Sequence, residues 1–130
     1  MKKHILPLTY KPKIRGIKNG TIKQTIRLGS KFKVGDCVMF HGWGGKPYRS
    51  KWSFRIPYTV ITEILDCCIY NWGIVIIGKG DYKWSELDWL AEMDGIEPPT
   101  GEELKRVLFE LNDIVQDDYH GTHAQIIRWS

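Results

Sequence analysis

The segment "GTIKQTIR" (residues 20–27) gathers polar side chains of types that can do chemistry on a ligand. Isoleucines alternate there with Lys23, Thr25 and Arg27. Successive side chains of a strand point to opposite faces, so these three polar groups should share one face. A threonine hydroxyl is a weak nucleophile that a nearby lysine with a lowered pKa can activate, and neighbouring cations lower a lysine's pKa. The segment is therefore either an edge strand with a wet face or a set of polar groups, Lys23, Thr25 and Arg27, gathered for chemistry on a ligand.

A second stretch, "HGWGGKPYRSKWSFR" (residues 41–55), interleaves basic and aromatic side chains around a glycine-rich turn. Cations that neutralise phosphates, placed beside aromatic faces that stack on bases, are typical of surfaces that bind single-stranded nucleic acid. The alternative is a hairpin whose aromatic side chains pack on the protein and whose charges are simply solvated. The candidate binding residues are Trp43, Lys46, Tyr48, Arg49, Lys51 and Trp52.

The charge of the chain is divided unevenly along its length. Residues 1–62 hold 14 Lys and Arg against one acid, Asp36, a formal +13, whereas residues 63–130 carry a formal −9. If the first half forms a continuous surface, it should attract a polyanion such as RNA. If the two halves neutralise each other across one compact fold, it should not. The sequence leaves both possibilities open.

We expect neither a metal nor another cofactor. The three cysteines are odd in number and two of them, Cys67 and Cys68, are adjacent, which argues against a disulfide framework. His120 and His123 have a spacing that could hold a metal, but the glycine between them interrupts any helix that would set them on one face. A solvated turn is the better interpretation of that segment.

Hydrophobic patterning predicts how these residues are positioned. Period-two alternation and β-branched runs predict strands over much of residues 21–77, and residues 123–130 read as a final strand. Helices are predicted over residues 85–95 and 100–115, and residues 9–20 suit a short helix or helical turn that ends at Asn19 and Gly20. Segregated helices indicate an α+β fold. With so many strands in one short domain (residues 1–130), we expect a small closed β-barrel of five or six strands with two or three helices packed around it.

Several ordered motifs together resemble the ASCH family, whose domains share a PUA-like β-barrel. The family pattern G-x-K-x-x-T-x-R is matched by Gly20, Thr25 and Arg27, and "KFKVGDCVMF" is similar to the strand entry that follows it in the family. "WLAEMDGI" resembles a later family segment in which a short helix ends in an acid next to glycine, and "IIRW" resembles the closing strand. The resemblance covers about residues 10–130.

The resemblance implies two kinds of function. Some ASCH proteins are small amidohydrolases that deacylate N(4)-acetylcytidine with a Lys, a Thr and a Glu, and others are thought to cleave single-stranded RNA. The threonine falls on Thr25 and the acid on Asp94, but the lysine falls on Ile22, which leaves the adjacent Lys23 as the candidate. We therefore expect a domain that binds RNA or a modified nucleoside in a basic cleft. The alternatives are a small hydrolase and a regulatory factor that binds an acidic protein.

The location of the protein is predicted from what its apolar segments lack. No apolar run approaches the roughly 18 residues that a membrane-spanning helix needs. The basic N-terminal segment also lacks the apolar region of a secretory signal. We therefore expect a cytoplasmic protein with no membrane partner.

Overall fold

The computed structural model of the protein describes residues 1–43, 52–112, 114 and 120–130, with residues 43 and 52–54 described by their backbone alone. Its elements, in chain order, are β1 (Lys3–Pro7), α1 (Lys11–Lys18), β2 (Gln24–Leu28), β3 (Cys37–Trp43), β4 (Trp52–Tyr70), β5 (Gly73–Ile76), β6 (Gly80–Lys83), the 3-10 turn η1 (Trp84–Glu86), α2 (Asp88–Met93), α3 (Gly101–Asn112) and β7 (Thr122–Trp129). None of the helices in this described part is long and apolar enough to cross a membrane.

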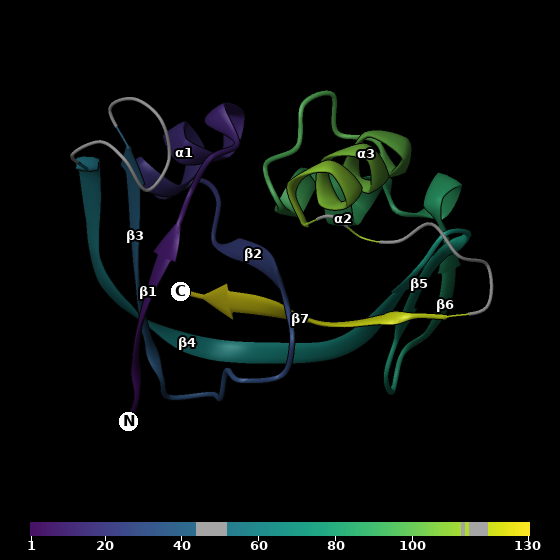
Figure 1. Ribbon diagram of the computed structural model, residues 1–130, viewed down its shortest axis with the longest axis horizontal. Helices are drawn as coiled ribbons and strands as arrows, with labels where there is room; N and C mark the ends of the chain where they lie inside the picture. Colours follow the sequence, from purple (N-terminus) through teal and green to yellow (C-terminus); the bar gives the residue numbers. More distant parts are fainter. Residues whose placement is uncertain (44–51, 113, 115–119) are drawn as a thin grey trace.

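The strands form one mixed sheet around the long strand β4 (Figure 1). β4 is 19 residues long and pairs antiparallel with β3, β5 and β7. β1 pairs with β3 in parallel, whereas β2 pairs antiparallel with β7 and β6 with β5. In the described part of the chain, β1, β2 and β6 each have a single neighbour, so they are sheet edges.

The α+β class predicted from sequence is confirmed, whereas the closed barrel is not what the described residues form. Their sheet is open and has seven strands rather than five or six, together with three α-helices. The two strands that the patterning did not reveal are β1 and β6, which have only five and four residues. In β1 the polar His4 is buried and the apolar Ile5 is exposed, and β6 has no buried residue, so neither strand shows an apolar face in the sequence.

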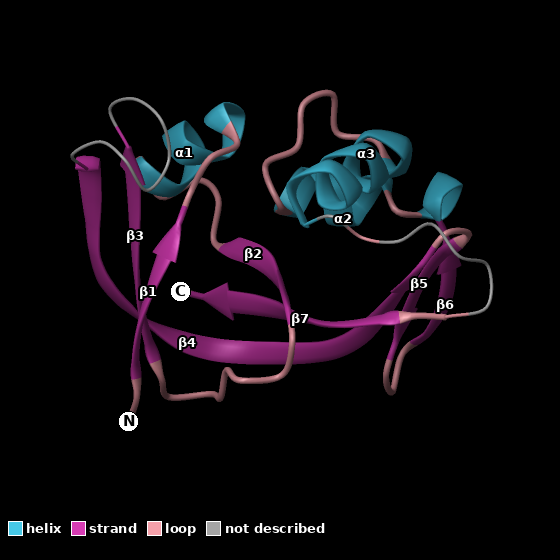
Figure 2. Ribbon diagram, in the orientation of Figure 1, coloured by secondary structure: helices cyan, strands magenta, loops and turns pink. Residues whose placement is uncertain are grey.

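All three helices lie on one side of the curved sheet (Figure 2). Helix α1 lies over the end that contains β1 and β3, and α2 and α3 lie over the end that contains β5 and β6. The buried side chains accordingly form two clusters. One joins Ile17 of α1 to Leu6 and Phe40 of β1 and β3, and the other joins the β4–β5 hairpin to Leu90 and Leu104 of α2 and α3. The junction of these two clusters is where α1, α2 and β2 meet.

Asp36 fastens the N-terminal strand to the turn before β3. Its carboxylate accepts hydrogen bonds from His4 Nε2 at 3.0 Å and from the backbone N–H groups of Lys2 and Lys33 at 3.1 and 3.2 Å. The side chains of Asp36 and His4 are both buried. The hydrogen bond from His4, followed by that from Lys2, lowers the pKa of the Asp36 carboxyl below its ordinary value.

This lowered pKa predicts an acid-sensitive contribution to stability. The contribution of Asp36 should be complete above the ordinary carboxyl pKa of about 4 and should be lost as the pH falls through the lower folded-state pKa. We expect Asp36→Asn to have a lower melting temperature than the wild type at pH 7, with the difference closing below about pH 4. Asp81→Asn, at an exposed position of β6, is the control. A gap that stays constant down to pH 2 would contradict the prediction.

Candidate functional site

Three side chains that are distant in sequence meet in a buried polar cluster. Lys13 Nζ lies 2.8 Å from Thr25 Oγ1 and 3.0 Å from Asp94 Oδ2. The exposed fractions are 7% for Lys13, 1% for Thr25 and 2% for Asp94. Burying a charge is costly unless it is paired and hydrogen-bonded, so Lys13 and Asp94 depend on each other to remain charged here.

Each of the three residues is held by a different element. Lys13 lies in the first turn of α1, one turn before Gly16 and Ile17, and these three residues form the buried stripe of the helix. Thr25 is placed by β2, where it pairs with Ile127 of β7. Asp94 is the residue at which α2 ends. The site thus requires α1, α2 and β2 to be in place together.

Ile22 fills the space between the helices beside this cluster. A Cβ atom on Gly16 would lie 2.2 Å from Ile22 Cγ1, and a Cβ on Gly95 would lie 3.1 Å from the same atom. The absence of side chains at both glycines lets Ile22 pack against α1 and the end of α2. Ile22, the position at which the ASCH resemblance places a lysine, is therefore an apolar side chain packed between α1 and the end of α2.

Burial acts on the ionisation of both charged members of the cluster. It lowers the pKa of Lys13, and the guanidinium of Arg27 lowers it further, while Asp94 opposes the shift. Burial raises the pKa of Asp94, against the opposing effects of Lys13 and of the hydrogen bond from Gln24. Burial thus favours the neutral form of each group, whereas their contact with each other favours the charged forms. A lysine with a lowered pKa can serve as a base once it has lost its proton.

Arg27 approaches Thr25 from the other side. Its Nε donates to Thr25 Oγ1 at 3.3 Å, and an Nη donates to the carbonyl oxygen of Pro7 at 2.8 Å. Thr25 Oγ1 therefore faces N–H groups of two basic side chains, Lys13 and Arg27. Hydrogen bonds from cations stabilise the deprotonated form of a hydroxyl, so this environment favours a reactive oxygen.

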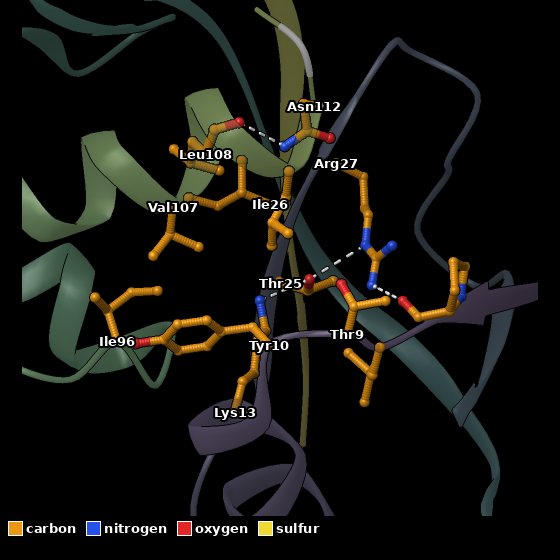
Figure 3. Close-up of a pocket in the computed structure, with 13 residues that line it drawn as sticks. Thr9, Tyr10, Lys13, Thr25, Ile26, Arg27, Ile96, Val107, Leu108 and Asn112 are labelled. Carbon is orange, nitrogen blue, oxygen red and sulfur yellow. Dashed lines mark hydrogen bonds between the residues drawn. The ribbon is translucent and has the colours of Figure 1, made fainter. Parts of the chain in front are cut away.

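These groups line a small cavity between α1, β2 and α3 (Figure 3). Its volume is about 70 Å³. Figure 3 shows Lys13 reaching from α1 toward Thr25, with Arg27 beyond it and the ring of Tyr10 forming one wall. The Tyr10 hydroxyl both accepts from the N–H of Glu97 and donates to its carbonyl oxygen, at 3.0 and 3.2 Å. That pair of bonds holds the wall against the segment after α2.

The structure brings together three of the residues selected from sequence and replaces a fourth. Thr25 and Arg27 share a face of β2, as the alternation predicted, and Asp94 joins Thr25 through Lys13. The expectation that Lys23 would accompany Thr25 is corrected. Lys23 precedes β2 and its side chain is exposed, whereas the ammonium on Thr25 belongs to Lys13.

A sequence signal for Lys13 does exist, although it was missed. Lys13 stands four residues before Ile17, on the apolar stripe of a helix that begins with proline near its first turn. Lysine is almost never buried unless it is paired, so a lysine on such a stripe indicates a distant acidic partner. The sequence does not reveal that the partner is Asp94, which lies 81 residues away.

The basic and aromatic segment predicted to bind nucleic acid falls largely outside the described residues. This applies to Lys46, Tyr48, Arg49 and Lys51, and to the side chains of Trp43 and Trp52. The backbones of the two tryptophans pair across β3 and β4. The role of this segment in binding stays a prediction.

Comparisons with protein-family models, with curated proteins and with solved structures found no match. Function must therefore be inferred from the chemistry of the cluster formed by Lys13, Thr25, Asp94 and Arg27.

Proposed function

We propose that this protein is a hydrolase in which Thr25 is the nucleophile and Lys13 is its general base. The observation that carries the proposal is the 2.8 Å contact between the buried side chains of Lys13 and Thr25, from Nζ to Oγ1, at the cavity. A hydroxyl nucleophile needs an adjacent base within hydrogen-bond reach, and a buried lysine with a lowered pKa is a suitable one.

The proposed reaction moves one proton back and forth on Lys13. In its unprotonated form, Lys13 Nζ accepts the hydroxyl proton as Thr25 Oγ1 bonds to the carbonyl carbon of an amide. Lys13 then gives that proton to the departing nitrogen as the carbon–nitrogen bond breaks, which leaves an acyl ester on Thr25. Water attacks this ester with Lys13 again accepting a proton, and the return of that proton to Thr25 Oγ1 releases the acid and restores the site.

Arg27 and Asp94 have separate roles in this proposal. Arg27 lines the cavity beside Thr25 and carries a positive charge close to the reacting oxygen, so it is suited to stabilise negative charge in the transition state. Asp94 holds Lys13 through its Oδ2 and raises the affinity of Lys13 for the transferred proton. Asp94 therefore opposes the lowering of the Lys13 pKa by burial.

The substrate class follows from the size of the cavity and from the resemblance to ASCH amidohydrolases. Cavities that enclose whole ligands typically have about 300–1,000 Å³. A volume of about 70 Å³ suits an acyl group with the edge of a ring, while the remainder of the substrate lies outside. An N(4)-acylated cytidine has this shape, with a small acyl amide on the exocyclic nitrogen. We take N(4)-acetylcytidine as the substrate to test.

The test is the release of acetate from N(4)-acetylcytidine by the wild type and by Thr25→Val. Valine keeps the shape of threonine but lacks the hydroxyl, so we expect at least about a 100-fold loss of rate with the fold retained. The control is Thr62→Val, the same substitution at an exposed position of β4. No acetate release by the wild type, or equal acetate release by Thr25→Val, would contradict the proposal.

A second candidate function is the binding of RNA without turnover, and one observation favours it. Helix α1, which supplies Lys13, also exposes Lys11, Arg15 and Lys18 at spacings of four and three residues. Side chains at these spacings lie on one helix face, opposite the buried stripe that contains Lys13. Affinity for a short single-stranded RNA should then fall steeply between 50 and 200 mM salt, on the order of tenfold or more. An affinity insensitive to salt would count against it.

A further inference from the structure

A row of polar side chains crosses three adjacent strands and ends on Asp94. Arg128 of β7 is paired with Gln24 of β2 on one side and with Glu63 of β4 on the other. Arg128 Nε donates to Gln24 Oε1 at 2.9 Å, and Arg128 Nη1 donates to Glu63 Oε1 at 2.7 Å. Gln24 Nε2 then donates to Asp94 Oδ1 at 3.3 Å. The row connects an exposed carboxylate at the surface to the buried cluster.

The chemistry of this row fixes the orientation of the Gln24 side chain. An arginine has only donors, so it requires the carbonyl oxygen of the Gln24 amide to face it. The amide nitrogen is thereby turned toward Asp94, where an ionised carboxylate can only accept. If the amide were reversed, its oxygen would meet the carboxylate and destabilise the ionised form. Arg128 therefore determines that the amide nitrogen of Gln24, rather than its oxygen, faces Asp94.

We propose that Arg128, acting through Gln24, is a positioning residue that keeps Asp94 ionised with its Oδ2 turned toward Lys13. This inference rests on the proposed function, because it assigns Asp94 the task of holding the base for Thr25. Asp94 uses one oxygen for each neighbour: Oδ1 for Gln24 and Oδ2 for Lys13. Gln24 is 1% exposed, so no water replaces its hydrogen bond at low cost.

The cationic groups around Asp94 also favour its ionised form. Lys13 faces it from α1 and Arg27 faces it from β2, and both favour the carboxylate against the effect of burial. Lys13 is in turn faced by Asp94 and by Arg27, which have opposite effects on it. Glu63 holds Arg128 on the side away from Gln24, so its own negative charge is separated from Asp94 by the whole row. Gln24 is the neutral group among these contacts, and its contribution depends on orientation alone.

The experiment is a titration of Asp94 followed by the 13C chemical shift of its carboxyl carbon, in the wild type and in Arg128→Met. Methionine keeps the length of the side chain but removes the donors that hold Gln24. We expect the titration midpoint of Asp94 to rise by about one pH unit, the size of one lost hydrogen bond to a charged group. Arg128→Lys, which keeps a donor, should restore at least half of the shift.

Two further variants make the result specific. Arg106→Met removes an arginine from an exposed face of α3, where it pairs with Glu103 and Glu110, and should leave the Asp94 midpoint unchanged. Gln24→Met should raise the midpoint as Arg128→Met does, and the double variant should add nothing to it, because both act on one path. An unchanged midpoint in a folded Arg128→Met protein, or additive shifts in the double variant, would overturn the inference.

This titration separates the inference from the proposed function. If the wild type releases no acetate from N(4)-acetylcytidine, the hydrolase proposal fails, whereas the Asp94 midpoint still reports whether Arg128 acts through Gln24. If the wild type is active, the pH profile of acetate release in Arg128→Met should move with the Asp94 titration. A pH profile whose maximal rate falls while its midpoint stays unchanged would count against a positioning role for Arg128.

Discussion

Replacing Lys13 with methionine is expected to lower the free energy of unfolding by about 3–5 kcal/mol at pH 8 and to abolish acetate release. Methionine fills a similar volume but leaves Asp94 as a buried charge without its cation, and removing one partner of a buried ion pair typically has this cost. Whole-domain stabilities are about 5–15 kcal/mol, so the variant should be markedly destabilised. Chemical denaturation at pH 8, with the acetate assay below the unfolding transition, measures both effects.

The destabilisation of Lys13→Met should depend on pH in a defined direction. Burial raises the pKa of the Asp94 carboxyl, and removal of Lys13 takes away the main opposing charge. A carboxyl with a raised pKa in the folded state favours folding at low pH and loses that advantage as the pH rises through the folded-state pKa. The cost of Lys13→Met should therefore be smaller at pH 5 than at pH 8.

A double variant tests whether the cost arises from the unpaired charge. Lys13→Met with Asp94→Leu replaces both charges by apolar groups, which is often close to neutral for a buried pair. We expect the double variant to be more stable at pH 8 than either single variant, and equally inactive. Additive losses in the double variant would show that the two side chains are not energetically coupled.

The substitution Gly101→Ala should produce the largest purely structural effect. Gly101 begins α3 at its contact with η1, and a Cβ atom there would lie 1.6 Å from the carbonyl oxygen of Trp84 and 3.3 Å from Leu87 Cβ. The obstacle is backbone rather than a side chain that can rotate away, so α3 has to shift. We expect a loss of at least about 3 kcal/mol, the upper end of what overpacking typically costs. Thermal unfolding followed by circular dichroism measures this loss.

The matched control for Gly101→Ala is Glu102→Ala, the next residue on the same helix turn. Glu102 is exposed, so its replacement should change the stability by less than about 0.5 kcal/mol. Because α3 also lines the cavity beside Thr25 through Val107 and Leu108, the glycine variant should lose the proposed activity together with stability. A folded Gly101→Ala protein with wild-type stability would show that η1 and α3 are not packed as described.

Local patterns in the sequence determined several features of the protein correctly. The alternation of residues 20–27 placed Thr25 and Arg27 on one face, since successive side chains of a strand point to opposite faces. The late position of two amphipathic segments predicted α2 and α3 and with them the α+β class. These inferences use the period of secondary structure, which a single segment carries by itself.

Only the tertiary structure decided which lysine contacts Thr25 and how the sheet is arranged. Lys23 was selected because it is adjacent in sequence, yet Lys13 reaches Thr25 from α1, and Asp94 arrives from the end of α2. The parallel pairing of β1 with β3, which makes β1 an edge strand of the sheet, likewise joins segments that are distant in sequence. Contacts of this kind depend on how the helices pack on the sheet, and the period of a short segment contains no information about that packing. The segment "GTIKQTIR" thus identified Thr25 and Arg27, and the fold placed Lys13 beside Thr25.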